Sequence, residues 1–281
     1  MNTSDSSVFQ PVNDPIQAHS QISSTILIHG FNSMVEHNEI ARIQVLYERL
    51  AQEIYNTRKK NYSWGFRVIE PEFFNYADRI NLVSKLYVEE ELADLNSIVF
   101  KLFIEFNNII LSTALHMHMP ITGIIRMGEA YRGSVKSRKP ALVSGKDPLI
   151  LSELLKVFSI GEIFPDGFSE GLIPAVDMPY HFGKIFCKSE LELSAIESVG
   201  IFLPADCISD RIADVTILAN MIVETEINGH RVLACNWKEW MREQTDCSAD
   251  NVIAYAEKQA KKSASTDAKM WKSLIEYASH L

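Results

Sequence analysis

Apolar positions along the first half of the chain change repeatedly between two spacings. Short, continuous β-branched runs are typical of buried strands, whereas apolar residues three and four apart are typical of one face of a helix. In chain order the pattern predicts a strand at 25–31, a helix at 38–57, strands at 66–71 and 79–85 around a turn at Asn75–Asp78, a helix at 88–117 ended by Pro120, and a strand at 121–127.

The second half of the chain alternates less regularly. Basic residues at 131–140 suggest a loop or hairpin tip, and the glycines and prolines of 160–182 indicate mostly irregular structure. Asn228-Gly229 is a strong hairpin signal. The remaining pattern predicts helices at 147–157 and 184–197, a strand at 199–203, a hairpin of strands at 215–223 and 230–236, and helices at 250–263 and 267–281.

The order of these elements predicts an α+β fold. Its first six elements read β-α-β-β-α-β, the ferredoxin-like plan of an antiparallel sheet packed against two helices. A C-terminal hairpin and a helical extension would complete the molecule. We therefore expect a disordered segment at 1–20, a main domain at 21–210, and an extension at 211–281 that packs on the same domain.

Charge and composition narrow the class of protein. The net charge of −9 argues against a nucleic-acid-binding surface, which needs clustered Lys and Arg. No uninterrupted apolar run reaches the roughly 18 residues that a membrane span needs, and residues 1–20 do not resemble a signal peptide. The four cysteines are widely spaced without a CxxC pair, which fits reduced thiols better than zinc ligands. We expect a cytoplasmic protein.

The segment Thr25–Met34 permits two interpretations. Leu-Ile-His-Gly-Phe resembles the oxyanion strand of an α/β-hydrolase, and Gly167-Phe-Ser169-Glu-Gly171 would supply the nucleophile Ser169. Asp206 or Asp214, and then His230, would complete a triad. However, Pro165 interrupts the strand that should precede this motif, and prolines follow where a helix should begin. The predicted order of elements also does not give a parallel, doubly wound sheet.

Four segments together favour the second interpretation. In their order and spacing they resemble the class III nucleotidyl cyclase homology domain, in a divergent bacterial form, and the resemblance covers roughly residues 22–205. The segments are Thr25–Val35, the hairpin Phe73–Ile80, the Gly-Glu strand Ile121–Tyr131, and His181–Glu190 followed by Gly200-Ile-Phe-Leu203; residues 143–156 are an alternative to 181–193 for the fourth segment, and 269–277 resembles the family's tail.

The resemblance implies a site that this chain has only in part. The family holds two Mg²⁺ or Mn²⁺ ions with two carboxylates, but aligned on Gly30-Phe31 the first falls on Leu27, and only Asp78 is retained. The base-reading Lys position is Phe74. The catalytic Asn and Arg positions are Cys187 and Leu191, or Leu149 and Glu153 on the other placement.

These departures predict a degenerate cyclase-like protein, a nucleotide-binding or regulatory module that forms a homodimer. The alternatives are an active nucleotidyl cyclase with a rearranged metal site and a hydrolase using Ser169. If a nucleoside triphosphate and Mg²⁺ or Mn²⁺ bind, the candidate cleft consists of Gly30, Phe31, Asn32, Asp78 and Arg126, with Asp78 as the candidate metal ligand.

Other polar residues have structural interpretations. Asp78 itself could cap a turn, and His29, at the end of an apolar run, is expected to be a hydrogen-bonded core or interface histidine. His116 and His118 are two residues apart near a helix end, so their side chains diverge and do not suggest a metal pair.

Overall fold

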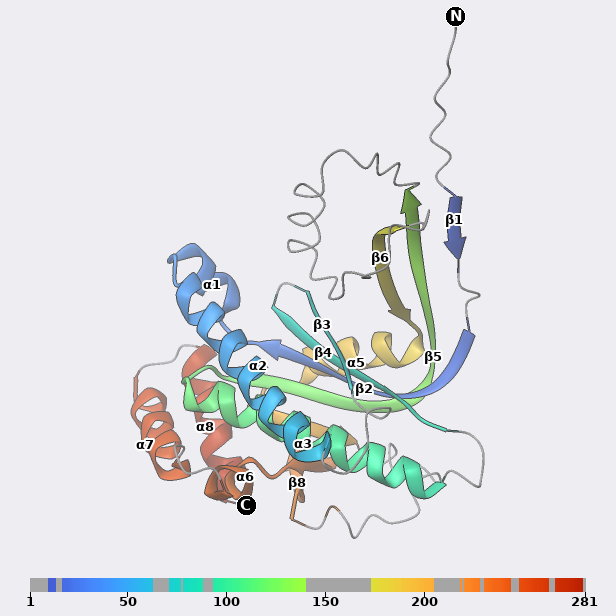
Figure 1. Ribbon diagram of the computed structural model, residues 1–281. Helices are drawn as coiled ribbons and strands as arrows, with labels where there is room; N and C mark the ends of the chain where they lie inside the picture. Colours follow the sequence, from blue (N-terminus) through green and yellow to red (C-terminus); the bar gives the residue numbers. More distant parts are fainter. Residues whose placement is uncertain are drawn as a thin grey trace, which may run out of the picture. The chain divides into compact units, whose positions relative to one another are not determined.

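A computed structural model gives the fold of this protein (Figure 1). It describes residues 10–13, 17–62, 71–76, 78–87, 93–139, 173–204, 218, 220–227, 230–243, 248–262 and 266–279. The elements are β1 (Gln10–Asn13), β2 (Gln17–Ile28), α1 (Phe31–Glu36), α2 (Ile40–Tyr62), β3 (Glu72–Tyr76), β4 (Arg79–Lys85), α3 (Ala93–His116), β5 (Ile121–Lys139), β6 (Ile173–Phe182), α5 (Lys184–Ala195), β7 (Gly200–Pro204), β8 (Ile222–Ile227), β9 (His230–Cys235), α6 (Trp237–Glu243), α7 (Ala249–Ala260) and α8 (Thr266–Ser279).

The sheet confirms the predicted β-α-β-β-α-β plan. Its strands are ordered β3-β4-β2-β5-β7-β9-β8. The connection through α2 joins β2 to β3 across β4, and α3 joins β4 to β5 across β2, so both crossovers are split in the ferredoxin-like manner. β4 is antiparallel to β2 and β3, but β7 is parallel to β5, which makes the whole sheet mixed.

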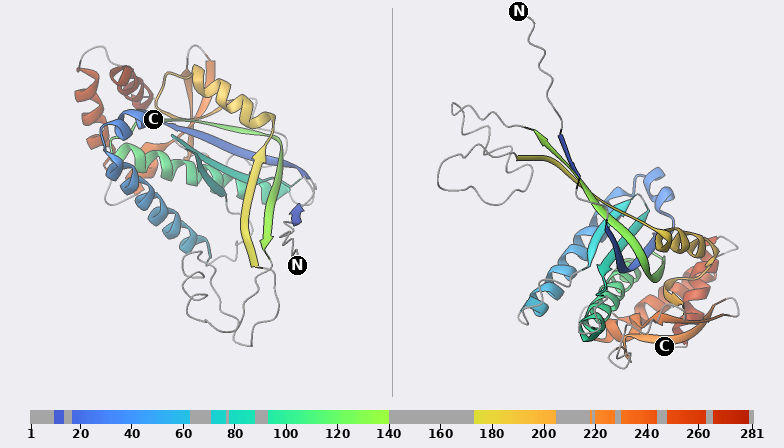
Figure 2. Two further views of the ribbon diagram at one scale, coloured as in Figure 1. Left: turned by 90° about the horizontal axis from the view of Figure 1, so that it is seen from above. Right: turned by 90° about the vertical axis from the view of Figure 1, so that its right-hand side faces the viewer.

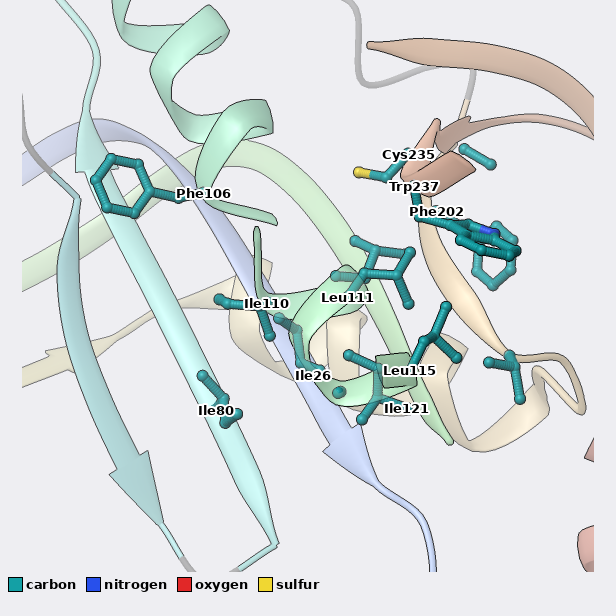
Figure 3. Close-up of a cluster of buried hydrophobic side chains, with 14 of the residues drawn as sticks. Ile26, Ile80, Phe106, Ile110, Leu111, Leu115, Ile121, Phe202, Cys235 and Trp237 are labelled. Atoms are coloured by element: carbon teal, nitrogen blue, oxygen red, sulfur yellow. The ribbon is translucent and has the colours of Figure 1, made fainter. Parts of the chain in front are cut away.

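The core lies between the sheet and α3. Ile26 of β2, Ile80 of β4 and Ile121 of β5 are buried and converge on α3, as Figure 3 shows. Phe73 of β3 contacts Phe106 of α3, with ring centroids 5.5 Å apart. Because successive side chains of a strand point to opposite faces, the neighbours Arg79 and Phe74 belong to the other face of the sheet, which α5 covers.

Two predicted boundaries are wrong at the amino-terminal half of the sheet. β2 begins at Gln17 rather than at residue 25, because its polar residues pair with β4, and Ser23 and Ser24 are fully buried. β3 spans Glu72–Tyr76, which includes Asn75 of the predicted turn, while its predicted range of 66–71 lies outside the described residues except for Pro71.

The predicted loop at 131–140 is also wrong. β5 continues through Lys139, because β6 pairs with it from Tyr131 onwards and β1 pairs with it at Val135–Arg138. β6 in turn occupies the end of the segment predicted as irregular. Its two prolines are tolerated because Pro174 lies at a register shift and because, among the described strands, β6 pairs with β5 alone, so fewer N–H donors are needed. The predicted helix at 147–157 lies outside the described residues.

The chain divides into two compact units. One comprises 1–17 and 131–182, and the other comprises 18–130 and 183–281. β5 contributes its first part to the larger unit and its second part to the smaller one. The larger unit contains α2, α3, α5 and β2–β4, so it contains the whole candidate site.

The C-terminal helices and the second strand of the hairpin agree with the prediction, but the first strand, predicted at 215–223, is wrong: β8 spans Ile222–Ile227, because the register pairs Ile222 with Cys235 and Ile227 with His230, and α6 was not predicted. β8 and β9 pair antiparallel, and α7 and α8 follow. Figure 2 shows these helices from two further directions. Among the described helices, α3 is long and apolar enough to cross a membrane, but 78% of that window is buried inside the fold, as in a core helix.

Candidate functional site

The end of β2 and the start of β4 bring Leu27 beside Asp78. Leu27 pairs with Arg79 in the β2–β4 register, and the Ile28 amide donates to the Asp78 carbonyl at 2.9 Å. The two positions that the cyclase resemblance assigns to metal carboxylates are therefore adjacent in space. One of them is an aliphatic side chain, which offers no ligand to a cation.

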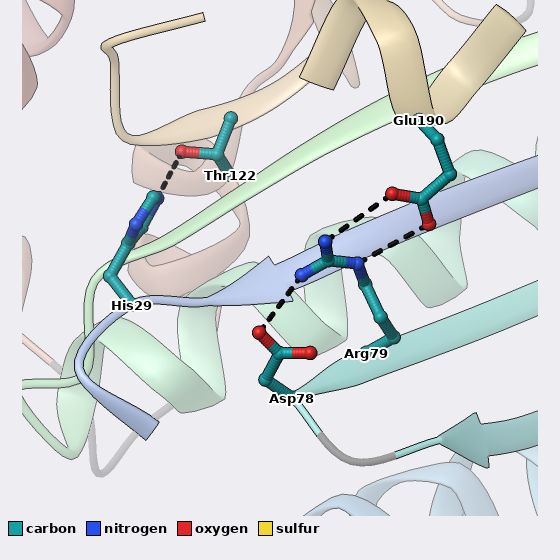
Figure 4. Close-up of polar contacts among 5 residues, drawn as sticks. All are labelled: His29, Asp78, Arg79, Thr122 and Glu190. Atoms are coloured by element: carbon teal, nitrogen blue, oxygen red, sulfur yellow. Dashed lines mark hydrogen bonds and ion pairs between the residues drawn. The ribbon is translucent and has the colours of Figure 1, made fainter. Parts of the chain in front are cut away.

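Arg79 lies between two carboxylates (Figure 4). Its Nη1 is 3.1 Å from Asp78 Oδ2. Its Nε and Nη2 donate to the two carboxylate oxygens of Glu190, on α5, each at 3.3 Å. The Asp78 carboxylate is thus already paired with a fixed positive charge, which competes with any cation for it.

A second ion pair joins α5 to the sheet. Arg126 of β5 donates to both carboxylate oxygens of Glu192, with Nε 2.7 Å from Oε2. Residues two apart on a helix lie on opposite flanks, so Glu190 and Glu192 hold α5 from both sides. Between these flanks, Ile185, Ser189 and Leu193 form the buried line of the helix.

Close backbone approach allows α5 to lie on the sheet. A Cβ at Gly128 would come within 2.4 Å of Ile185 Cγ2, so a glycine is needed under the helix. Phe74, at the position where the resemblance expects a base-reading Lys, makes an edge contact with Phe186 of α5, with ring centroids 6.4 Å apart. The Phe74 side chain therefore packs against α5 and has no positive charge with which to contact a base.

The outer side of α5 carries the residues at the family's Asn and Arg positions. Cys187 is an exposed free thiol, and Leu191 is 73% exposed. One turn apart, they share the solvent face of the helix; Leu191 has no hydrogen-bond donor, and the thiol of Cys187 is a much weaker donor than the Asn–Arg pair would supply. The alternative positions, Leu149 and Glu153, lie outside the described residues.

The remaining cleft candidates lie at the start of α1. Gly30 has φ +73° and open space around its Cβ position, and its carbonyl accepts from the Met34 amide at 2.9 Å. Phe31 packs partly buried against the core, and Asn32 is exposed. His29, just before them, is hydrogen-bonded to Thr122 of β5, as expected of a structural histidine.

One residue near Asp78 was not predicted from the sequence. Burial, and secondly the charge of Asp78, raise the pKa of the Tyr47 hydroxyl above its ordinary value. Tyr47 comes from α2, where it occupied an ordinary apolar position in the helical pattern.

These donors do not fit the two-metal site that the resemblance implies. Two-metal phosphoryl chemistry needs carboxylates that bridge or flank both ions. Here Leu27 replaces one carboxylate and Arg79 neutralises the other. Among the described residues, no group of three or more His, Cys, Asp or Glu side chains is placed to hold a metal ion.

The hydrolase alternative has no support in the fold. Ser169, Asp206 and Asp214 lie outside the described residues, so the triad itself has no described geometry. The sheet, however, has antiparallel β2–β4–β3 pairing, whereas a hydrolase elbow requires a parallel, doubly wound sheet.

Comparison with known proteins gives similarity in structure alone. No protein-family model matches the chain, and no curated protein matches it in sequence. The structure is similar to class III cyclase catalytic domains across most of the chain. One example is the adenylyl cyclase CyaB from P. aeruginosa, with 10% sequence identity, a TM-score of 0.41, and coverage of 79% of this chain and 96% of that one. The guanylyl cyclase Cya2 has 9% identity, a TM-score of 0.40, and coverage of 78% of this chain and 91% of that one. The dimeric guanylyl cyclase domain of RhoGC from Blastocladiella emersonii has 8% identity, a TM-score of 0.38, and coverage of 78% of this chain and 96% of that one.

Proposed function

We propose that this protein is a cyclase-like regulatory module that has lost two-metal catalysis and retains a nucleotide-binding cleft. One observation carries the loss of catalysis: the Arg79 guanidinium pairs with Asp78 at 3.1 Å, beside Leu27 at the other metal position. An active enzyme would need both positions to be free carboxylates. In this proposal the protein acts in the cytoplasm as a homodimer.

The chemistry of the site supports this proposal. In-line attack on a nucleoside triphosphate requires a metal-activated hydroxyl and positive charge around the transferring phosphoryl group. The described arginines near the cleft, Arg79 and Arg126, are both engaged by glutamates of α5. Without the metal that Leu27 and the paired Asp78 no longer hold, the attacking hydroxyl is not activated, and both arginine charges are already neutralised. Nucleotide binding, in contrast, needs only a few hydrogen-bond donors and an apolar surface the size of a base.

The test is incubation of the purified chain with each nucleoside triphosphate and Mn²⁺, followed by detection of cyclic nucleotide and pyrophosphate. We expect no product, together with a thermal shift caused by at least one nucleotide. Robust turnover that disappears in Asp78→Ala would refute the proposal and establish the alternative, an active nucleotidyl cyclase with a rearranged metal site.

A parallel measurement covers the hydrolase alternative. Hydrolysis of an aryl ester that disappears in Ser169→Ala would favour the hydrolase over the cyclase-like module. Asp78→Asn serves as the control in the ester assay, because it removes the charge at the cleft and leaves Ser169 unchanged.

A further inference from the structure

Arg79 is incompletely satisfied by its two partners. Its hydrogen bonds to Glu190 are 3.3 Å long, against about 2.7–2.9 Å for a strong charge-assisted pair. Within the described part of the chain, Nη1 is a buried donor that completes no hydrogen bond, although Asp78 lies at ion-pair distance. Nη1 keeps its charge pair with Asp78, and the long hydrogen bonds to Glu190 leave the Nε and Nη2 edge of Arg79 with capacity for a better anion.

The helix that supplies Glu190 packs on the sheet through few apolar side chains. Its buried line contains two aliphatic side chains, Ile185 and Leu193, separated by Ser189, whose hydroxyl bonds back to the Ile185 carbonyl. Its N-cap, Gly183, provides no side-chain cap. Phe186 adds an edge contact with Phe74, and the ion pairs on the two flanks add to this limited apolar attachment.

The two ion pairs between α5 and the sheet differ in their exposure to solvent. The side chains of Arg79 and Glu190 are 25% and 48% exposed, so solvent and small ions reach this pair. Those of Arg126 and Glu192 are 11% and 34% exposed, and their hydrogen bonds are shorter. An anion in solution would therefore compete first for Arg79, on the flank of α5 that faces β3 and β4.

We propose that Arg79 is the anion-binding residue of the cleft and that Glu190 is its built-in competitor. A phosphate group presents three acceptor oxygens to the Nε and Nη2 edge of the guanidinium, one more than the Glu190 carboxylate, while Nη1 stays paired with Asp78. Binding of a phosphorylated small molecule at Arg79 then releases Glu190 and loosens α5. This inference rests on the proposed function and adds to it how ligand occupancy becomes a change in conformation.

The first test measures affinity. Inorganic triphosphate is titrated calorimetrically into the wild-type chain, Glu190→Gln and Arg79→Gln at low salt. Removing the charge of the internal competitor is expected to raise affinity about two- to fivefold, in line with exposed ion pairs, and Arg79→Gln is expected to lose binding. Glu197→Gln is the matched control, because it removes an exposed charge just beyond α5 and is expected to leave affinity within the error of the wild type.

The second test follows α5 directly. Hydrogen exchange of a peptide covering 184–195 is measured with and without triphosphate. We expect faster exchange in the bound wild-type chain, and equally fast exchange in Glu190→Gln without ligand. Circular dichroism of each variant separates a loosened helix from a misfolded chain.

Three outcomes would overturn the inference: equal affinity of the wild type and Glu190→Gln, unchanged α5 exchange on binding, or no binding to either protein. Each is distinguishable from failure of the proposed function. Production of a cyclic nucleotide would refute the proposed function, whatever the affinity of Glu190→Gln. Nucleotide binding of equal affinity in the wild type and Glu190→Gln would refute the role of Glu190 and leave the proposed function intact.

Discussion

The imidazole Nε2 of His29 lies 2.6 Å from Oγ1 of Thr122, and a second hydrogen bond of Thr122 fixes the direction of this one. Thr122 donates its single hydroxyl proton to the Ser198 carbonyl, which can only accept. The hydroxyl oxygen must therefore accept from His29, so the His29 ring carries a proton on Nε2. The chain of bonds joins the end of β2 to β5 and to the turn before β7.

Thr122→Val tests this chain of bonds. Valine keeps the shape but removes the hydroxyl group that contacts both His29 Nε2 and the Ser198 carbonyl, so we expect a loss of about 1–2 kcal/mol in the free energy of unfolding. Urea denaturation measures it. Thr122→Ser, which retains the hydroxyl, should recover most of the loss; a Ser variant as unstable as the Val variant would assign the effect to packing.

Gly128→Ala tests the close packing of α5 on β5. The new methyl group would meet Ile185 Cγ2, so the helix must shift, and overpacking of this kind costs about 1–3 kcal/mol. Hydrogen exchange in 184–195 should rise with the loss of stability. The double variant Gly128→Ala with Ile185→Ala provides the control, because the space freed by Ile185 accommodates the methyl group; additive losses in the double variant would contradict this contact.

Leu27→Asp tests why the metal site is lost. We expect that Leu27→Asp alone does not create a Mn²⁺ site, because Arg79 lies opposite in the register and pairs with the new carboxylate. Leu27→Asp combined with Arg79→Leu should bind Mn²⁺, which electron paramagnetic resonance of the free ion detects without any assay of activity. Tight Mn²⁺ binding by the single variant would show that Arg79 does not prevent the new carboxylate from binding a metal ion.

Stability should fall on acidification because of His118. Burial first, and then the charges of His116 and Arg42, lower the pKa of this imidazole, whose ring stacks on Tyr255 of α7 at 3.6 Å. A histidine whose pKa is lower in the folded chain than in the unfolded one stabilises the fold above the unfolded value of about 6.5, and this contribution is lost as the pH falls below it.

Denaturation between pH 5 and pH 8 measures this effect. His118→Asn is the matched variant, because His118 has φ +58°, a conformation that Asn tolerates. The variant should be less stable at pH 8 and should have a flatter dependence on pH. The same slope in both proteins would assign the acid sensitivity to other groups.

The sequence was sufficient for elements whose burial follows a local pattern. α2, α3 and β4 were predicted close to their observed bounds, and with them the split crossover plan. The extension of β5 through Lys139 was not predictable, because polar residues there form a strand only through pairing with β1 and β6, which are distant in the sequence.

The candidate site also has features that the sequence predicted and features that only the fold reveals. The proximity of position 27 to Asp78 could be inferred from motif spacing. Glu190 and Glu192 were not singled out, because a glutamate on an amphipathic helix normally faces solvent, and only the tertiary position of α5 brings them to Arg79 and Arg126. Tyr47 was missed because a tyrosine at an apolar helical position reads as core.

The apolar composition of α3 has a consequence for synthesis of the chain. Its partners in the fold include β7, β9 and α6, all of which leave the ribosome long after α3 itself. Until they emerge, one of the most hydrophobic helices of the protein has no complete cover, and contacts this distant in sequence form slowly. Chains truncated before Trp237 should therefore aggregate or recruit chaperones, because α6, which packs on α3, is then missing.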